Sequence, residues 1–156
     1  MTAPEASLLE TVISPDRVFT TTATSKEALI NDLIDRLNTC GDVSDLEGLR
    51  TAILARESLM STGIGLGVGA PHARISSVRD MILAVAVNSI PLEDYESIDG
   101  QPVKIVFLVA GRPDQQSRYV RLLAALSHVV KDEEKRSALM AATRPDEILT
   151  LLQPAG

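Results

Sequence analysis

Apolar residues recur along this chain with two different spacings, which predict alternating helices and strands. In residues 24–37, 44–57 and 114–130 they recur every three or four positions, the spacing of one face of an α-helix. Residues 81–87 and 103–110 are instead nearly continuous apolar runs, typical of strands buried on both faces of a sheet. Helices before and after such strands predict an α/β fold, a three-layer α/β/α sandwich with a mixed sheet of about five strands flanked by helices.

Short signals mark where the predicted helices begin and end. Thr24–Glu27 and Ser44–Glu47 each fit the capping box that opens a helix, and Gly41 stands where the first of these helices needs a C-terminal cap. A further helix is expected at 132–142. Pro145 is placed to open the last helix, because proline is favoured in a first helical turn.

The remaining segments carry weaker patterns. Residues 1–7 are polar and expected to be frayed, and residues 8–13 predict one short helical turn. β-Branched residues at 17–22 predict a first strand. Residues 88–101 are polar and rich in turn formers, with Asp99-Gly100 as the strongest turn signal, so we expect a long connection between the two apolar strands.

Composition indicates a globular protein with an aliphatic core. Of the 156 residues, 45% are apolar and 3% aromatic, which predicts a single domain over residues 1–156 with a core of Leu, Ile, Val and Ala. The net charge of -6 argues against nucleic acid as a partner, since phosphate backbones attract basic surfaces. An acidic protein is instead suited to a basic partner protein.

The single cysteine and the distribution of apolar residues favour a cytoplasmic location. Cys40 has no partner for an internal disulfide, which fits a reducing compartment, and we interpret it as a small apolar filler near a helix end. The first residues lack the basic and apolar regions of a signal peptide. No apolar stretch reaches the roughly 20 residues that span a bilayer, so direct membrane insertion is not expected.

The most unusual stretch of the chain is 61–74, in which every second residue from Gly63 to Gly69 is glycine. In an extended segment this spacing clears one face for other backbone or for a ligand, while the intervening apolar residues fill a core from the other face. Those residues are Ile64, Leu66 and Val68. Pro71 then fixes its own φ, so His72 is expected at a rigid exit from the strand, as part of a built site.

Glycine-rich segments also occur in nucleotide-binding motifs. Gly65–Ala70 fits the loose dinucleotide-binding pattern, but that pattern needs a preceding strand and a helix that starts within it. Here a helical pattern precedes the glycines and a proline follows them. A P-loop is excluded because no Gly-Lys-Ser/Thr ends the run. A glycine-rich strand with an incidental histidine stays open as an alternative.

The available side chains narrow the chemistry to His72 itself. Further metal ligands at matched spacing and a G-x-S-x-G nucleophile elbow are both missing from the sequence, so neither a metal nor another cofactor is expected. A neutral imidazole can attack phosphorus and hold the phosphoryl group. Arg56 is expected to supply positive charge. The hydroxyls of Ser61 and Thr62, with backbone N–H groups such as that of Gly63, are expected to bind the phosphoryl oxygens.

The same stretch resembles a known signature. Its ordered parts are similar to the active-site motif of the type-2 IIA domains of the bacterial phosphoenolpyruvate:sugar phosphotransferase system, which are the fructose, mannitol and nitrogen-regulatory IIA proteins. Those parts are Arg56-Glu57-Ser58, Ser61–Gly65, Gly67, Pro71-His72 and Arg74. The resemblance extends from about Leu8 to Leu152 and leaves no room for an attached IIB, IIC or HPr module. It departs at Gly69-Ala70, where the family usually has alanine and then a branched apolar residue.

This resemblance implies a phosphotransferase component with His72 as phospho-acceptor. It implies that HPr, or its nitrogen-branch counterpart, donates the phosphate, and that a IIB domain or a regulatory target receives it or reads it. Many members bring a second histidine from the long helix to the first; here Tyr119 stands in that place, which leans toward a nitrogen-regulatory role. The Tyr119 phenol is expected to donate a hydrogen bond to a phosphoryl oxygen, and packing in the core with the hydroxyl at its rim stays open as the alternative. From the residues alone, two interpretations of Glu57 stay open: it pairs with Arg56 or Arg74 and orients that arginine, or it is a plain surface carboxylate.

Two hypotheses of other classes stay beside this one. The first is a module of the same fold that binds partner proteins and is no longer phosphorylated. The second is a sensor of anions or small ligands that uses the glycine run. His128 lies on the long helix, and no role is expected for it.

Overall fold

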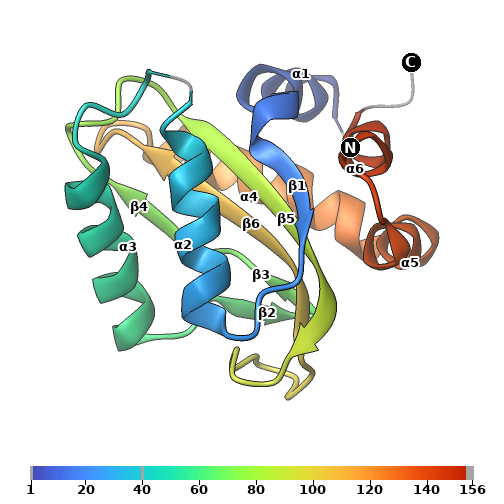
Figure 1. Ribbon diagram of the computed structural model, residues 1–156. Helices are drawn as coiled ribbons and strands as arrows, with labels where there is room; N and C mark the ends of the chain where they lie inside the picture. Colours follow the sequence, from blue (N-terminus) through green and yellow to red (C-terminus); the bar gives the residue numbers. More distant parts are fainter. Residues whose placement is uncertain (1, 40, 154–156) are drawn as a thin grey trace.

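A mixed sheet of six strands separates two layers of helices in the computed structural model, which describes residues 2–39 and 41–153 (Figure 1). The strand order is β1-β5-β6-β3-β2, with β4 also paired to β6. Only the β5–β6 and β2–β3 pairs are antiparallel among these strands. The strands are β1 (Val18–Thr21), β2 (Gly63–Gly65), β3 (Val68–Gly69), β4 (His72–Arg74), β5 (Ile82–Leu92) and β6 (Val103–Gly111). The expected α/β/α fold is confirmed, with six strands in place of about five.

The helices divide between the two faces of this sheet (Figure 1). One face carries α2 (Lys26–Leu37) and α3 (Leu46–Leu59). The other face carries α1 (Ala3–Val12), α4 (Gln116–Lys131), α5 (Glu133–Ala141) and α6 (Pro145–Leu152). A short 3₁₀ turn, Pro15–Arg17, leads into β1. Among the described residues, no helix has both the length and the apolar character needed to cross a membrane.

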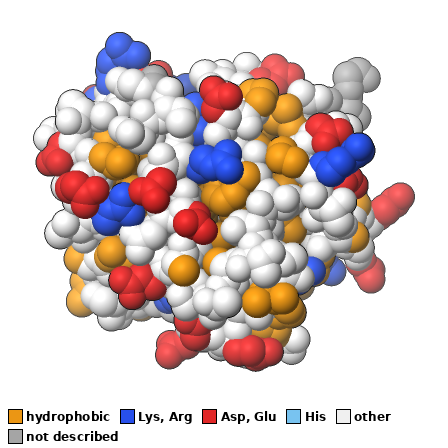
Figure 2. Space-filling view, in the orientation of Figure 1, with side chains coloured by type: hydrophobic (Ala, Val, Ile, Leu, Met, Phe, Trp, Pro, Cys, Tyr) orange, Lys and Arg blue, Asp and Glu red, His pale blue; other side chains and the backbone are white. Residues whose placement is uncertain are grey.

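Alternating residues of the two long strands fill two separate cores. On β5, Leu83 and Val85 face the α1/α4/α5/α6 layer, whereas Ala84 and Ala86 face α2 and α3. Strand β6 alternates in the same way. Both strands are therefore buried on both faces, which is why their sequences read as continuous apolar runs. On the face that carries α2 and α3, acidic and basic side chains are interspersed at the surface (Figure 2).

Several predicted boundaries differ from the structure. Helices α2 and α3 begin one residue later than the capping boxes suggest, because Ser25 and Asp45 cap them through the N–H groups of their third residues. The segment 1–7, expected to be frayed, is helical from Ala3, since Thr2 and Glu5 form a capping box there. Strand β5 runs into the expected turn region, as far as Leu92. Cys40 lies outside the described residues.

The glycine run is a tight hairpin and not one extended strand, so that prediction was wrong. Leu66 and Gly67 have φ angles of 59° and 76°, and this pair of left-handed residues turns β2 back onto β3. Val68 is fully buried as expected, but Ile64 and Leu66 are 44% and 43% exposed. The reversal of the chain sends the side chains of Ile64 and Leu66 to the surface instead of into the core.

Candidate functional site

His72 is the first residue of β4, where this short strand pairs in parallel with the end of β6. The preceding residue is fixed because the Pro71 carbonyl accepts a 3.0 Å hydrogen bond from the Val109 N–H. The imidazole is half-buried. It borders a cavity of about 440 Å³, which we call the His72 cavity, and a second cavity of about 590 Å³ on the side of Arg74 and Pro113. The ring is thus held by the sheet and open to solvent.

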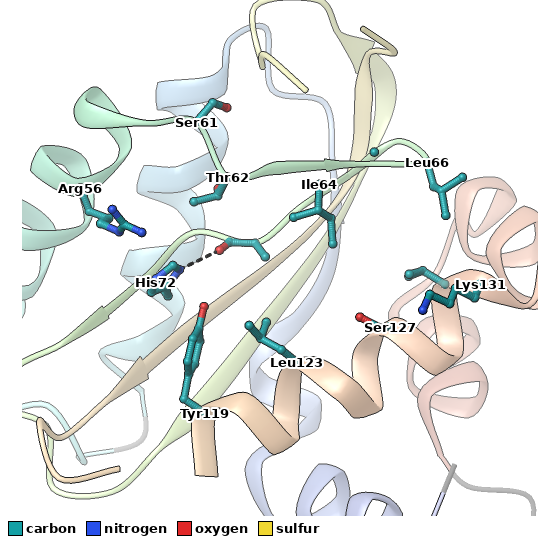
Figure 3. A pocket seen from close by; sticks show the side chains of 13 residues that line it. Arg56, Ser61, Thr62, Ile64, Leu66, His72, Tyr119, Leu123, Ser127 and Lys131 are labelled. Atoms are coloured by element: carbon teal, nitrogen blue, oxygen red, sulfur yellow. Dashed lines mark hydrogen bonds between the residues drawn. The ribbon is translucent and has the colours of Figure 1, made fainter. Parts of the chain in front are cut away.

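A hydrogen bond fixes which ring nitrogen is available for chemistry. Nδ1 of His72 lies 3.1 Å from the carbonyl oxygen of Ala70 (Figure 3). Since a carbonyl oxygen can only accept, we assign the proton to Nδ1. The lone pair of a neutral ring is then on Nε2.

The surroundings of His72 favour the neutral ring. Burial lowers the pKa of His72 most strongly. The hydrogen bond to Ala70 and the charge of Glu57 raise this pKa, while the positive charges of Arg56 and Arg74 lower it further. The net pKa lies below the usual value, so His72 is uncharged and nucleophilic near pH 7.

Arg56 comes from the last turn of α3 and borders both cavities with His72. Figure 3 shows its guanidinium and the Tyr119 hydroxyl on opposite sides of the His72 ring. The guanidinium makes no ion pair or hydrogen bond with any other side chain in the described part of the chain. An exposed, unpaired guanidinium beside a neutral imidazole is available for an anion.

Tyr119 reaches the site from α4. Its ring centroid lies 4.7 Å from that of His72, with the ring planes tilted by 34°. Burial raises the pKa of Tyr119 to about 12, although Arg56 and Arg74 oppose this shift. The phenol therefore stays protonated and is a hydrogen-bond donor next to His72.

Ser61 and Thr62 border the His72 cavity, but their hydroxyl protons are engaged elsewhere. Ser61 Oγ donates to the Glu96 carbonyl at 2.6 Å. Thr62 Oγ1 lies 3.0 Å from both carboxylate oxygens of Glu57 and 2.7 Å from the Tyr95 hydroxyl. Because the carboxylate can only accept, Thr62 donates to Glu57 and accepts from Tyr95. Both hydroxyls thus stabilise the cavity wall in this structure, and their binding of phosphoryl oxygens stays a prediction.

The three other expected site residues lie around this wall. Gly63 does not line the cavity: it is buried in β2, where a Cβ would lie 2.1 Å from the Glu96 carbonyl oxygen. Arg74 lines the second cavity and donates a 3.4 Å hydrogen bond to the Pro113 carbonyl. Glu57 pairs with neither arginine, so that prediction was wrong.

The partner of Glu57 is Lys26, whose Nζ lies 3.0 Å from Glu57 Oε1. Sequence reasoning missed both Lys26 and Tyr95, which join this buried cluster from the start of α2 and from the β5–β6 connection. Neither residue stands in or near the glycine run, and nothing in their local sequence marks them. In the described residues, no group of three or more His, Cys, Asp or Glu is placed to hold a metal ion.

The far half of the His72 cavity is apolar. Ile64 and Leu66 from the hairpin lie across from Leu123 of α4, and Lys131 closes that end (Figure 3). Val130 of α4 also lines this cavity. The arrangement therefore combines a neutral imidazole and an unpaired guanidinium with an apolar surface of the kind that proteins bind.

Comparisons with known proteins agree on one family. The sequence model described as "Phosphoenolpyruvate-dependent sugar phosphotransferase system, EIIA 2" matches residues 11–154. The PTS system fructose-specific EIIABC component of Bacillus subtilis is 35% identical over 127 residues, which are 81% of this chain and 20% of that protein. The chain therefore spans about one fifth of the length of this relative.

Shorter relatives match over more of their own length. The PTS system fructose-specific EIIA component of Haloferax volcanii is 29% identical over 128 residues, 82% of each chain. A nitrogen regulatory protein of Bradyrhizobium diazoefficiens is 30% identical over 100 residues, 64% of this chain and 65% of the relative. The sequence relatives thus include proteins named as fructose-specific PTS components and proteins named as nitrogen regulatory.

Solved structures share the fold. The crystal structure of nitrogen regulatory protein IIA-Ntr from Neisseria meningitidis superposes with a TM-score of 0.83 at 24% identity, covering 93% of this chain and 99% of that one. The IIA mannitol enzyme of Escherichia coli, in complex with phosphorylated IIB mannitol, gives a TM-score of 0.76 at 22% identity. That match covers 90% of this chain and 96% of the other.

Proposed function

This chain belongs to the EIIA type 2 family of the phosphoenolpyruvate-dependent sugar phosphotransferase system, and we propose that it is a phosphocarrier whose acceptor is His72. One observation carries the proposal. The imidazole has its Nδ1 proton bound to Ala70 and its Nε2 free, beside an unpaired Arg56 at the edge of an open cavity.

The transfer step needs no metal and no cofactor. The lone pair of Nε2 attacks the phosphorus of a phosphohistidine on the donor, forming the new P–N bond as the donor's P–N bond breaks. The electron pair of the broken bond returns to the donor imidazole. The Nδ1 proton stays between His72 and the Ala70 carbonyl, which stabilises the charge that develops on the ring. Passing the group on reverses this step with a different partner.

Two groups of this chain are placed to bind the transferred oxygens. The Arg56 guanidinium supplies positive charge, and the Tyr119 hydroxyl donates a hydrogen bond from the other side of the ring. Neither group is engaged by another side chain of the described residues in a hydrogen bond or ion pair. Positioning and charge are what phosphoryl transfer asks of a protein.

The proposed donor is an HPr-like phosphocarrier, or its nitrogen-branch counterpart, acting in the cytoplasm. The proposed acceptor is a IIB domain, which the relatives named EIIABC and the solved IIA–IIB complex support, or a regulatory target. Tyr119 in place of a second histidine leans the proposal toward a nitrogen-regulatory-like carrier. The same residue favours the alternative, a partner-binding module of this fold that is not phosphorylated.

Phosphorylation with purified components tests the proposal. The chain is incubated with phosphoenolpyruvate, enzyme I and HPr, and its mass is measured before and after mild acid. We expect a gain of one acid-labile phosphate. His72→Gln should abolish the gain, while His128→Gln, the matched control at the second histidine, should retain it. No gain on the native chain, with partner binding intact, would establish the unphosphorylated module instead.

Arg56 is tested separately. Arg56→Ala is expected to slow phosphorylation by about 100-fold, because a charged donor to the transition state is worth a few kcal/mol. The rate is measured in single turnovers with phospho-HPr in excess. Arg121→Ala, an exposed arginine on α4 outside the cavity, is the matched control and should react like the native chain. Equal rates for both variants would remove Arg56 from the site.

A further inference from the structure

A buried polar cluster lies directly behind the His72 cavity, and the proposed transfer step does not use it. Its members come from four separate segments, which are the start of α2, the last turn of α3, the connection after α3, and the β5–β6 connection. They are Lys26, Glu57, Ser61, Thr62 and Tyr95. The cluster therefore joins the element that carries Arg56 to the wall of the cavity.

Lys26 is at the centre of this cluster. Its Nζ lies 3.0 Å from Glu57 Oε1, donates to Ser61 Oγ at 3.2 Å and stands 4.5 Å from the centroid of the Tyr95 ring. Its backbone N–H is held as well, by the Asp94 carboxylate at 2.9 and 3.1 Å. A lysine with 18% side-chain exposure and fixed at both ends is not a solvated surface cation.

Glu57 needs this partner for two reasons. Its side chain is only 5% exposed, and a buried carboxylate without a counter-charge is costly. Its negative charge also acts on His72, where it raises the pKa of the imidazole. Neutralised by Lys26, Glu57 is free to accept hydrogen bonds from the N–H and hydroxyl of Thr62. It thereby fixes the segment that lines the cavity.

We propose that Lys26 is a positioning residue for the phosphoryl transfer, acting through Glu57 and Ser61. It holds the end of α3, and with it Arg56, against the cavity wall. It also offsets the negative charge of Glu57, which would repel the phosphoryl group at His72. This inference rests on the proposed function of His72, but part of its test does not depend on phosphorylation.

The effect of Lys26 on the charge of Glu57 can be measured as a change in the pKa of His72, because charged and titratable groups surround the ring. These groups are Arg56 and Glu57 from α3, Arg74 from β4 and Tyr119 from α4. Of these, Glu57 alone raises the pKa of the imidazole. Removing the Lys26 charge leaves the field of Glu57 uncompensated, so the pKa of His72 should rise.

The experiment compares Lys26→Met with the charge-neutral double variant Lys26→Met/Glu57→Gln. Lys104→Met is the matched control, since the Lys104 ammonium donates to the Met140 carbonyl away from His72. For each protein, the pKa of His72 is measured by NMR titration, and the single-turnover rate is measured at saturating phospho-HPr. Circular dichroism checks folding.

Lys26→Met is expected to raise the pKa of His72 and to slow the saturated rate by roughly tenfold, with the phospho-HPr concentration for half-maximal rate little changed. The double variant should return the pKa toward the native value, because both charges are gone. Lys104→Met should change neither quantity. If Lys26→Met is too unstable to titrate, the double variant is compared with Glu57→Gln alone. The double variant should then have the lower rate of the two.

Three results would overturn the proposal. They are a native rate and pKa in folded Lys26→Met, a raised pKa that the double variant does not correct, and a double variant as fast as Glu57→Gln. Failure of the proposed function looks different, because the native chain would then take no phosphate while its His72 titration could still be followed.

Discussion

At the scale of single residues, the site depends on how the surroundings of His72 fix the tautomer and the charge of its imidazole. The Ala70 carbonyl selects the tautomer, and burial with two nearby guanidinium groups keeps the ring neutral. Arg56 brings charge without being neutralised by another side chain of the described residues. Sequence spacing placed Arg56 and His72 in one motif, but the state of the ring depends on contacts that the motif does not show.

The lowered pKa of His72 predicts an unusual pH profile. The rate of phosphorylation should stay constant as the pH falls from 8 to about 6.5 and decline only below that value, since protonation removes the lone pair. Single-turnover rates with phospho-HPr, together with an NMR titration of His72, measure this. The peptide Ala-Pro-His-Ala in the same buffers is the reference, and a pKa for His72 at or above that of the peptide would contradict the prediction.

The lowered pKa of His72 also predicts how the stability of the fold depends on pH. The folded state binds the His72 proton less tightly than the unfolded state does. This group therefore contributes stability that is fully present above about pH 6.5 and is lost as the pH falls through that value toward the folded pKa.

Tyr119 is the residue at which a substitution separates packing from chemistry. Tyr119→His should leave the chain folded, at a cost of about 1 kcal/mol, and should preserve or raise the rate, because an imidazolium brings charge that a phenol lacks. Urea unfolding and single-turnover rates measure the two effects. Tyr119→Phe is the control for the hydroxyl and should be slower than the native chain. A collapse of stability in Tyr119→His would show that Tyr119 is mainly a core residue.

At the scale of elements, the glycine hairpin is the feature that the sequence pattern misrepresented. Alternating glycines fit an extended strand with one clear face, but positive φ at Leu66 and Gly67 folds the segment back on itself. Glycine is needed at position 69 for a different reason. A Cβ there would lie 2.5 Å from the Tyr95 ring, so glycine leaves room for this aromatic side chain. The hairpin then presents Ile64 and Leu66 at the cavity.

Leu66 carries backbone strain that a substitution should release. Its φ of 59° lies in the left-handed region, which disfavours leucine and suits asparagine. Leu66→Asn should therefore stabilise the fold by about 0.5–1 kcal/mol in urea unfolding. Ile64→Asn is the matched control: it has nearly the same exposure, 44% against 43%, but no positive φ, and it should not stabilise. Equal effects of both substitutions would exclude strain as the cause.

At the scale of the whole molecule, the sheet places the site where the two helical layers meet. Helix α3 brings Arg56 from one layer and α4 brings Tyr119 from the other, with His72 on the sheet between them. The surface around the site is apolar toward the hairpin, while the chain as a whole carries a net charge of -6. These features suit a partner that approaches by charge and docks on an apolar surface.

The net charge predicts a salt dependence for the reaction with a basic donor. The second-order rate constant for phosphotransfer from HPr should fall as sodium chloride is raised, because screening weakens the attraction between the two proteins. The single-turnover rate at saturating donor is the internal control and should change little. A second-order constant that does not respond to salt would show that charge does not steer this encounter.

The sequence by itself determined the fold class, most of the helices and both long strands, because periodicity, caps and apolar runs are local. It also placed Arg56 and His72 in one site, since their motif is short. Only the tertiary structure decided the tautomer of His72, the hairpin, and the pairing of Glu57 with Lys26. The ion pair joins two helices that are distant in sequence, whereas the hairpin and the tautomer depend on the φ angles of Leu66 and Gly67 and on the direction of the Ala70 carbonyl. None of these follows from the spacing of residues along the chain.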